Sequence, residues 1–414
     1  MIKKKVTSAL PSPVLSAYHF VLAFIAALFC GFPSRDVVVV GVTGTKGKSS
    51  TIEYLNIIFE TAGWKTAISS SIRFKIDTVS EPNTRRMTIP GRFFVQNFIA
   101  QAASAGCGIV FIELTSEGAR QHRHRFISLN ALLFINLSPE HIESHGSLQA
   151  YADAKFELGK QLARSSKRPR YMIANADDAE SGRYLSLSVE SPIPFSLSSA
   201  TPFEARERNG FFTFGETRIT VPLPGEFSLM NALAAATFAR AFGIREDAIA
   251  RGIARLTHNP GRAEDFDEGQ SFTAVVDNAH TPDSLRSIYE AYGTRRKVCV
   301  LGSTGGGRDL WKRPVMGGVA DTHCDTIILT NEDPYDEDPR GIVDMIARGI
   351  EKHTPETIMD RRSAIARALS LARSGDCVII TGKGTDPTIQ GARGKSVPWS
   401  DAQVVREELR KMRG

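Results

Sequence analysis

The residues best suited to chemistry lie in a glycine-rich segment, GVTGTKGKSS, at positions 41–50. Backbone N–H groups of such a turn, with the N-terminus of a helix that follows it, can surround phosphate oxygens. Lys48 is expected to reach the β and γ phosphates of a nucleoside triphosphate, and Ser49 to ligate Mg²⁺ with help from Ser50. The full phosphate-loop pattern requires glycine at position 42, where this chain has Val42. The prediction therefore depends on Gly-Lys-Ser and its place between a strand and a helix; the alternative is a glycine-rich turn capped by serine.

The elements on either side of this turn can be predicted from their side chains. Residues 37–40 are four valines, a β-branched run too short for a helix and typical of a buried strand. Residues 49–62 place apolar side chains at helical spacing, and Gly63 supplies a stop. Because further strand-like runs alternate with helix-compatible sequence, we expect a mainly parallel sheet covered by helices. These runs lie at 108–114, 131–137 and 171–174.

Glu113 stands at the C-terminal end of the strand predicted at 108–114. This is the edge at which open α/β sheets bind ligands, and carboxylate oxygens are ligands that Mg²⁺ prefers. Glu113 is therefore the best candidate for a metal carboxylate. The alternative is a carboxylate that only caps the next turn.

A second α/β unit is expected after residues 257–261, Thr-His-Asn-Pro-Gly, which end a pattern of two helices at 229–242 and 245–256. Turn residues and alternating patches at 183–223 suggest a β-rich insertion. The predicted fold class is α/β, with a P-loop-type, mainly parallel central sheet at 36–257 and a smaller Rossmann-like unit at 258–414. In the second unit we expect strands at 272–276, 297–301, 326–330 and 377–381, and helices at 284–292, 341–352 and 363–372.

Composition narrows the class of protein. A chain of 414 residues with 42% hydrophobic residues can bury two to three cores. The net charge of +6, from 51 basic and 45 acidic residues, is too small and too dispersed for a protein that wraps nucleic acid. The 5 cysteines are odd in number and far apart, so we expect neither a disulfide framework nor a zinc knuckle, and we expect a cytoplasmic protein.

The N-terminal segment, residues 1–35, is expected to form an apolar helix. Three lysines at 3–5 precede a stretch without formal charge, and residues 14–30 are nearly all apolar. The stretch is at the short end for a membrane span of ~20 residues, and one crossing would separate the phosphate turn from cytoplasmic nucleotides. We therefore expect residues 12–32 to pack on the protein or to lie in a membrane interface. A true anchor or signal is the alternative.

The order of motifs along the chain resembles the Mur ligases, and in particular their MurE branch. The resemblance covers the chain from about residue 37 to the C-terminus. The motifs that carry it are GTKGKS at 44–49, ELTS at 113–116, NLSPEH at 136–141, YADAK at 151–155, LPGEF at 223–227, PGRAE at 260–264, DNAHTPD at 277–283 and GKG at 382–384.

This resemblance implies an ATP-dependent carboxylate-amine ligase of peptidoglycan precursor synthesis. MurE enzymes add the third amino acid, usually meso-diaminopimelate or lysine, to UDP-N-acetylmuramoyl-L-alanyl-D-glutamate. The acceptor carboxylate is phosphorylated to an acyl phosphate, which the incoming amine attacks. Cations and Mg²⁺ must then neutralise the charge on the transferred phosphoryl group. A monomer acting on small molecules is expected, with no nucleic-acid partner.

The resemblance also implies roles for individual residues. Glu113 and His141 match metal ligands, and Lys155 matches a carbamylated lysine, a residue whose anion can approach Mg²⁺; without the motif it would be assigned as an exposed helix lysine. His145 is expected to be structural. With Lys48, both Lys155 and His141 are the expected catalytic residues. Expected nucleotide contacts are Gly44, Thr45, Lys46, Gly47, Lys48, Ser49, Ser50, Asn231, Arg262 and Asp277, and expected substrate contacts are Thr88, Thr115, Gln121, Arg123, Asp333, Tyr335 and Asp386.

Two departures from the family pattern concern the incoming amino acid. Residues 332–335 read Glu-Asp-Pro-Tyr where diaminopimelate enzymes have Asp-Asn-Pro-Arg, so Tyr335 replaces an arginine fork for the second carboxylate of diaminopimelate. Residues 382–386 read Gly-Lys-Gly-Thr-Asp where Gly-Lys-Gly-His-Glu is usual, and Asp386 could still meet the incoming ammonium. Lysine or another diamino acid is thus as plausible as diaminopimelate.

A third departure concerns the acceptor. Only about 36 residues precede the first predicted strand, where the family usually has a domain that holds the uridine nucleotide. Three alternatives therefore stand beside the MurE assignment: a relative of folylpolyglutamate synthase, a ligase of lipid-linked muropeptide, and a non-catalytic ATP-binding module tethered to a membrane.

Overall fold

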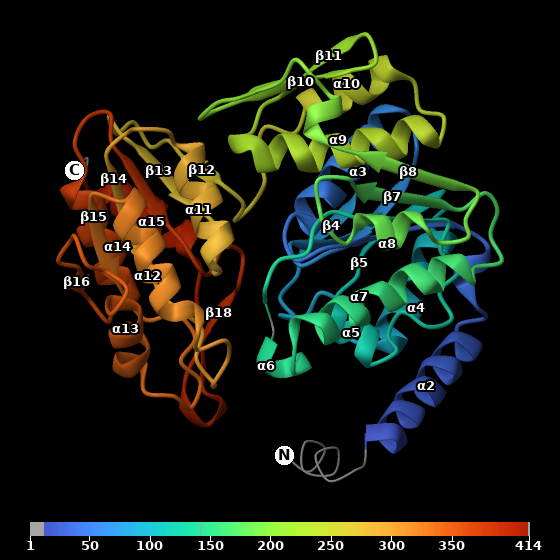
Figure 1. The fold of residues 1–414 in the computed structure, drawn as a ribbon, viewed down its shortest axis with the longest axis horizontal. Helices are drawn as coiled ribbons and strands as arrows, with labels where there is room; N and C mark the ends of the chain where they lie inside the picture. Colours follow the sequence, from blue (N-terminus) through green and yellow to red (C-terminus); the bar gives the residue numbers. More distant parts are fainter. Residues whose placement is uncertain (1–11, 141, 413–414) are drawn as a thin grey trace.

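The computed structural model describes residues 12–140 and 142–412. Its first part is built on an eight-stranded sheet, here called the large sheet, in the order β4-β3-β2-β5-β1-β6-β7-β8 (Figure 1). Neighbours from β2 to β8 in that order pair in parallel, and β3 and β4 add an antiparallel edge. The strands are β1 (Val38–Thr43), β2 (Thr66–Ser69), β3 (Arg73–Ile76), β4 (Val79–Pro82), β5 (Ile109–Glu113), β6 (Ala131–Phe134), β7 (Tyr171–Asn175) and β8 (Ser191–Phe195).

Helices cover both faces of the large sheet, as Figure 1 shows. Alternate residues of β1 lie in two different cores, Val40 and Val42 on one face and Val39 on the other. A strand buried on both faces has no polar positions, which explains its continuous valine run. The first face is covered by α3 (Lys48–Thr61), α9 (Gly225–Ala241) and α10 (Glu246–Ala254), and the second by α4 (Arg92–Ser104), α5 (Ser116–Arg120), α7 (Leu148–Ala163) and α8 (Ser181–Leu185).

The β-rich insertion expected at 183–223 is present in a modified form. Three short strands pair antiparallel in the order β11-β10-β9 and pack on α9. The first strand of the region, β8, instead joins the edge of the large sheet. The short strands are β9 (Glu204–Ala205), β10 (Gly210–Phe214) and β11 (Thr217–Val221).

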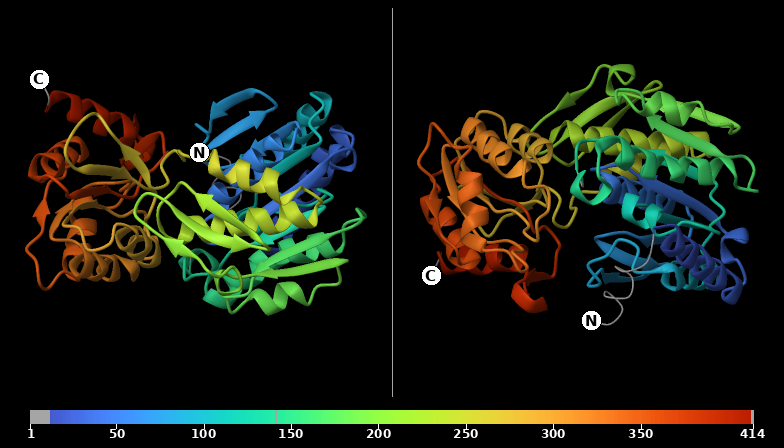
Figure 2. Two further views of the ribbon diagram at one scale, coloured as in Figure 1. Left: turned by 90° about the horizontal axis from the view of Figure 1, so that it is seen from above. Right: turned by 60° about the horizontal axis from the view of Figure 1, so that its bottom comes forward.

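The C-terminal sheet has six strands in the order β12-β13-β17-β14-β15-β16 and lies beside the large-sheet part (Figures 1 and 2). All its neighbours pair in parallel except β12, which is antiparallel to β13. The α/β fold class predicted from the sequence, with a larger and a smaller sheet, is therefore confirmed. The strands are β12 (Glu264–Phe266), β13 (Thr273–Val276), β14 (Lys297–Leu301), β15 (Thr326–Leu329), β16 (Glu356–Thr357) and β17 (Cys377–Ile380).

Helices also cover both faces of this sheet, forming two further cores. A small hairpin of β18 (Thr388–Gln390) and β19 (Ser396–Pro398) follows the last parallel strand. The helices are α11 (Pro282–Ala291), α12 (Lys312–His323) and α13 (Pro339–Ala347) on one face, and α14 (Arg361–Leu371) and α15 (Asp401–Lys411) on the other.

One expectation from the cysteines is wrong. Cys299 on β14 and Cys324 at the end of α12 form a disulfide, with Cα atoms 6.1 Å apart. The two are 25 residues apart in sequence, and spacing alone gave no sign of their contact. They meet because α12 packs back onto the strand that precedes it. Cys30, Cys107 and Cys377 are free thiols.

The N-terminal helix α2 (Ser12–Phe29) packs against α4, as expected for residues 12–32, and a short 3-10 turn, η1 (Pro33–Arg35), joins it to β1. Within the described ranges, no helix is long and apolar enough to cross a membrane.

Candidate active site

The glycine-rich segment forms a turn between β1 and α3, as predicted. Gly47 caps α3 with φ at 82°, and a Cβ there would lie 2.2 Å from Oδ1 of Asn231. Only glycine combines that conformation with that close approach. Lys48 folds back over the turn and its Nζ donates to the carbonyls of Gly44 and Thr45, at 3.0 and 2.9 Å. The turn thus has the backbone shape expected of a phosphate site, and the Lys48 ammonium lies against the turn's own carbonyls.

Asn136, in the segment after β6, holds the turn in place. Its Oδ1 accepts hydrogen bonds from the backbone N–H groups of Thr45 and Lys46, at 3.0 and 2.9 Å. Its Nδ2 donates to the carbonyl of Lys46. The hydroxyl of Tyr151, on α7, lies 3.1 Å from Oγ1 of Thr45. Asn136 and Tyr151 lie in the motifs at 136–141 and 151–155, but residue type alone did not indicate these roles.

Glu113 and Ser49 meet at the carboxyl edge of the large sheet. The Ser49 hydroxyl donates to Oε2 of Glu113 at 2.8 Å, and the Ser71 backbone N–H donates to the same oxygen at 2.9 Å. Nζ of Lys48 lies 3.9 Å from Oε1 of Glu113, and the Glu113 residue is only 3% exposed. An isolated buried carboxylate would be unfavourable, and these donors together with the lysine compensate its charge.

Lys155 approaches the same turn from α7. The helix begins after Ser147, whose side chain caps it, and it buries Lys155 to 2% exposure. Nζ of Lys155 donates to the carbonyl of Gly44 at 2.7 Å. Burial, and then the nearby Lys48, lower the pKa of Lys155 well below its usual value. A lowered pKa favours the free amine of Lys155, which is the nucleophilic form that reacts with carbon dioxide.

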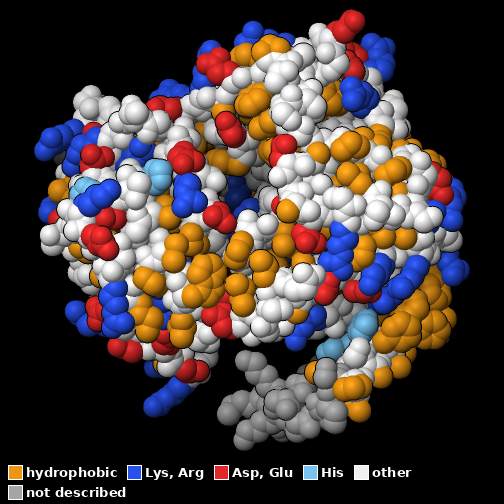
Figure 3. Space-filling model, viewed as in Figure 1, with side chains coloured by type: hydrophobic (Ala, Val, Ile, Leu, Met, Phe, Trp, Pro, Cys, Tyr) orange, Lys and Arg blue, Asp and Glu red, His pale blue; other side chains and the backbone are white. Residues whose placement is uncertain are grey.

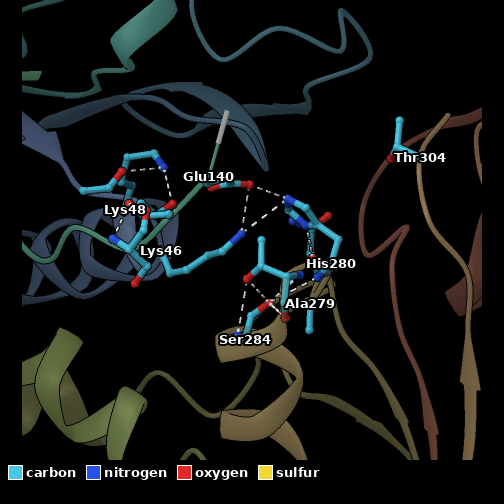
Figure 4. A network of polar contacts seen from close by, with 12 residues as sticks. Lys46, Lys48, Glu140, Ala279, His280, Ser284 and Thr304 are labelled. Atoms are coloured by element: carbon cyan, nitrogen blue, oxygen red, sulfur yellow. Dashed lines mark hydrogen bonds and ion pairs between the residues drawn. The ribbon is translucent and has the colours of Figure 1, made fainter. Parts of the chain in front are cut away.

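A polar network joins the phosphate turn to the C-terminal sheet (Figure 4). Oε1 of Glu140 lies 3.2 Å from Nζ of Lys46 and 2.9 Å from Nε2 of His280. Nδ1 of His280 contacts the carbonyl of Asn278 at 2.6 Å, so the ring is held from both sides. Burial and the charge of Lys46 lower the pKa of His280. Glu140 and His280 also lie in the motifs, at 136–141 and 277–283, but their contact could not be inferred from the motifs.

A cavity of about 260 Å³ lies between the two sheet units, beside the phosphate turn. Asp277 borders it and accepts hydrogen bonds from the backbone of Ala263 and Ala279, at 2.7 and 2.6 Å. Burial raises the pKa of Asp277, although Arg262 opposes the shift. The structure thus brings together the residues expected to contact the nucleotide from both units. Those lining the cavity are Lys46, Gly47, Ser50, Asn231, Arg262 and Asp277.

A second cavity, of about 250 Å³, also borders the turn and shares Lys46 and Gly47 with the first. It is lined by Ser49 and Glu113 and by two of the expected substrate residues, Thr88 and Thr115. Thr115 also caps α5, accepting from the N–H of Gly118 at 3.1 Å. Arg262 lines both cavities.

Gln121 and Arg123, the other expected acceptor residues, do not line this second cavity. Arg123 donates to Oε1 of Gln121 at 2.6 Å and to the carbonyl of Ile89. Arg92, at the start of α4, donates to the carbonyl of Gln121 at 2.7 Å. These side chains form a separate network next to the segment that carries Thr88.

Asp333 and Asp386, expected near the incoming amine, lie in one cluster of charges. Nζ of Lys383 contacts both carboxylates, at 2.9 Å for Asp333 and 3.0 Å for Asp386. Arg86, from the large-sheet part, contacts the same two carboxylates at 3.2 and 3.1 Å. Burial alone would raise the pKa of Asp386, but Lys383 and Arg86 lower it. Nothing in the sequence pattern pointed to Arg86.

Tyr335 lies at the edge of this cluster, with φ at 54° and the Arg308 guanidinium 5.3 Å from its ring centre. His141 lies outside the described residues. The His145 ring packs edge-on against Tyr151 with centres 5.2 Å apart, which agrees with a structural role.

Magnesium would fit the oxygen donors of Ser49 and Glu113, because both face the phosphate turn and hard cations prefer oxygen. Among the described residues, no group of three or more His, Cys, Asp or Glu could hold a metal ion by itself. A cation here would therefore need further ligands, such as oxygens of a bound phosphate or of water, to complete its shell.

The fold and the site together define an ATP-dependent amide-bond ligase: the chain belongs to the Mur ligase family. Residues 42–239 match the Mur ligase middle domain, and residues 261–384 match the Mur ligase, glutamate ligase domain.

Proteins similar in sequence to this chain belong to the MurE branch. The UDP-N-acetylmuramoyl-L-alanyl-D-glutamate--2,6-diaminopimelate ligase of Syntrophomonas wolfei is 33% identical over 404 residues, 94% of this chain and 81% of that protein. The UDP-N-acetylmuramyl-tripeptide synthetase of Roseiflexus sp. is 32% identical over 415 residues, with the same two coverages of 94% and 81%.

Solved structures agree with this assignment. A UDP-N-acetylmuramoyl-L-alanyl-D-glutamate--2,6-diaminopimelate ligase superposes with a TM-score of 0.61 at 26% identity, over 91% of this chain and 79% of that one. The folylpolyglutamate synthase of Mycobacterium tuberculosis superposes with a TM-score of 0.71 at 18% identity, over 88% of this chain and 92% of that one, and so shares the fold.

Proposed function

We propose that this ligase joins an amino acid to the carboxylate of a UDP-muramoyl-peptide-like acceptor, through an acyl phosphate formed with ATP. The observation that carries the proposal is the meeting of Ser49, Glu113 and Lys155 at one turn, from α3, β5 and α7. The MurE relatives, similar over most of the chain, support the choice of acceptor.

The two cavities suggest how the substrates divide between them. ATP would occupy the cavity between the sheets, with its phosphates on the turn and its nucleoside among Asn231, Arg262 and Asp277. The acceptor carboxylate would enter the second cavity, which is lined by Thr88 and Thr115 and borders the same turn. Because Arg262 lines both, it is placed to contact the phosphoryl group that moves from one substrate to the other.

The reaction then follows in two transfers. A carboxylate oxygen of the acceptor attacks the γ phosphorus and ADP leaves, giving an acyl phosphate. The amine of the incoming amino acid attacks the acyl carbon, loses a proton, and inorganic phosphate leaves as the amide forms. Lys48 must swing from the carbonyls of Gly44 and Thr45 to reach the phosphates. Mg²⁺, held by Ser49 and Glu113, would supply charge neutralisation for the phosphates.

For Lys155 we propose carbamylation, as in the family pattern. Its burial and lowered pKa support this role, since a neutral amine is needed for the reaction with carbon dioxide. The carbamate would be an anion beside the phosphate turn. His141 is proposed as a metal ligand on the family resemblance alone.

The amine site is proposed at Asp333, Asp386 and Tyr335. Lys383 and Arg86 already pair with both carboxylates, so a second ammonium group would bind here by displacing one of these cations. Tyr335 lacks the fork that would hold a second carboxylate. Lysine or another diamino acid fits this cluster at least as well as diaminopimelate.

Three further expectations remain proposals: the division of the chain into 1–35, 36–257 and 258–414, a monomeric state, and work in the cytoplasm, where ATP and the precursors are found. A ligase of lipid-linked muropeptide is the second candidate, and the exposed apolar face of α2 favours it.

The test is mass spectrometry of products from ATP, UDP-muramoyl dipeptide and a mixture of amino acids, with omission of ATP and of acceptor as controls. We expect one tripeptide product and one phosphate released per amide formed. Phosphate release that depends on neither acceptor nor amine would contradict the proposal.

A further inference from the structure

Helix α2 buries small side chains and exposes large ones. Its inner face packs Ala23, Ala26 and Ala27 against the protein, at 2%, 0% and 0% exposure. Its outer face exposes apolar side chains along its whole length. An amphipathic helix with one face in water normally buries its largest apolar side chains and exposes polar ones. Helix α2 shows the opposite distribution. The exposed side chains are Val14 (50%), Tyr18 (42%), Phe20 (43%), Val21 (52%), Phe24 (42%), Ile25 (45%), Leu28 (58%) and Phe29 (83%).

The apolar face extends beyond the helix and is continuous. Phe93, on α4, is 47% exposed, and its ring centre lies 6.4 Å from that of Phe29. Figure 3 shows the resulting hydrophobic patch at the lower right of the molecule, over α2. A helix of 18 residues extends about 27 Å. A patch of this length marks an interaction surface rather than scattered apolar residues.

The helix is fixed to the protein along its length. The Ser16 hydroxyl lies 2.8 Å from Nε2 of His122, and the Phe20 and Phe24 rings pack against Phe126 with centres 5.1 and 5.3 Å apart. The exposed face is therefore presented in one orientation.

The charges around this face favour an anionic surface as its partner. The sequence of α2 contains no Asp, Glu, Lys or Arg. At its C-terminal end lie the exposed Arg35 and the segment of Lys167 and Arg168, joined by a hydrogen bond of 2.7 Å from Nζ of Lys167 to the Arg35 carbonyl. Asp36 is the exposed carboxylate beside them, and Glu190 pairs with Arg168 at 3.0 Å.

The chain before the helix adds further positive charge. In the sequence, three lysines at positions 3–5 precede α2 by fewer than ten residues, and no acidic residue lies between them and Asp36. Apolar residues flanked by cations at both ends match the acyl boundary and the headgroups of an anionic bilayer.

We propose that α2 binds the surface of an anionic lipid bilayer, with its outer apolar face at the boundary between headgroups and acyl chains. The helix lies along the surface and does not cross it. Through α4 it adjoins Arg92 and Gln121, in the network expected to meet the acceptor. Membrane binding would thus bring the acceptor side of the protein to the bilayer. The proposed membrane binding itself does not depend on the ligase activity.

The test is flotation of the full chain with vesicles, without ATP or acceptor. Vesicles of phosphatidylglycerol and phosphatidylethanolamine are compared with vesicles of phosphatidylcholine alone. We expect at least tenfold stronger binding to the anionic vesicles, and a weaker preference at high salt. No binding to either vesicle, or equal binding to both, would overturn the proposal.

The matched variants are two pairs of apolar-to-glutamate changes. Leu28→Glu with Phe29→Glu should reduce binding at least tenfold, whereas Val79→Glu with Val397→Glu, at positions 74% and 59% exposed elsewhere on the protein, should leave it unchanged. Thermal melting shows whether each variant is folded. Binding unchanged in the α2 pair, or lost equally in both pairs, would count against the proposal.

A second copy of the chain is the competing partner for this face. Sedimentation velocity of the full chain without vesicles distinguishes the two. We expect a monomer in both the parent protein and the α2 pair. A dimer in the parent that dissociates in the α2 pair would assign the face to self-association and overturn the proposal.

Discussion

Arg86 and Asp386 lie 300 residues apart in the chain, yet the guanidinium Nε and the carboxylate Oδ1 are 3.1 Å apart. Arg86 comes from the large-sheet part and Asp386 from the segment after β17, so the pair joins the two units at the proposed amine site. Lys383 neutralises the same carboxylates from within the C-terminal unit. The position of Arg86 therefore couples the approach of the two units to the charge at the amine site.

From this pair we predict that Arg86→Met raises KM for the amino acid roughly three- to tenfold, with a smaller change in KM for ATP. Without the ion pairs of Arg86, the approach of the two units around the amino acid is no longer favoured. The phosphate turn is unchanged, so ATP binding should be affected less. Steady-state kinetics at two salt concentrations measure it, and the difference from the parent should shrink at high salt, because the arginine side chain is 25% exposed.

Arg85→Met is the matched control, since Arg85 lies over the Phe94 ring, 4.9 Å from its centre, within the same part of the protein. An unchanged KM for the amino acid in Arg86→Met, or an equal change in both variants, would show that the ion pair has no part in amine binding.

Lys155→Ala is predicted to lose about 100-fold or more in kcat while the fold is retained. The loss follows from removal of the proposed carbamate beside the phosphate turn, and a short carboxylic acid added to the assay should restore part of the rate. Lys160→Ala, on the same helix but with a 40% exposed side chain, should behave as the parent. Normal turnover of Lys155→Ala would rule out the carbamate.

The sequence predicted best those strands that are buried on both faces. The segments of β1, β5, β14 and β17 are continuous apolar runs, and the structure places strands there to within about three residues. By contrast, β4 (Val79–Pro82) is exposed at the edge of the sheet and has no pattern that distinguishes it from a loop. Periodicity detects burial only over a longer apolar run, so this edge strand was not found. The buried strand β2 (Thr66–Ser69) was also missed, because only two of its four residues are apolar.

Helix α12 was missed for a different reason. It carries two adjacent glycines, which disfavour a helix in isolation. A Cβ at Gly317 would lie 2.0 Å from the carbonyl oxygen of Ile346, so the glycine permits α12 to pack closely on α13. Tertiary packing, absent from any local pattern, overrides the propensity here.

The residues of the candidate site also fall into those that local sequence predicts and those that only the fold brings together. The phosphate turn and Glu113 could be located from local sequence, because each depends on its own strand and helix. The contacts of Asn136 with Lys46 in the turn, of Glu140 with His280, and of Arg86 with Asp386 join segments 90, 140 and 300 residues apart. A single sequence contains no record of such pairs, since only the fold brings them together.

Tyr335→Arg is predicted to shift amine preference toward diaminopimelate. A guanidinium at this position would supply the fork for a second carboxylate, and one charge-assisted pair corresponds to roughly tenfold in kcat/KM relative to lysine. Competition between the two amino acids, read by mass spectrometry, measures the shift. Tyr335→Phe controls for loss of the hydroxyl alone, and an unchanged preference in Tyr335→Arg would place the distal end of the amino acid elsewhere.

Glu113→Gln is predicted to raise the Mg²⁺ concentration required for half-maximal activity by about tenfold or more. The carboxylate accepts from Ser49 and Ser71, and an amide would keep the shape but lose the negative charge that attracts the cation. Activity titrated with Mg²⁺ after removal of metal by a chelator measures the change. Glu81→Gln, at an exposed position on β4, is the control and should titrate as the parent. If both variants require the same Mg²⁺ as the parent, Glu113 is a structural partner of Ser49 and the cation is held by other groups.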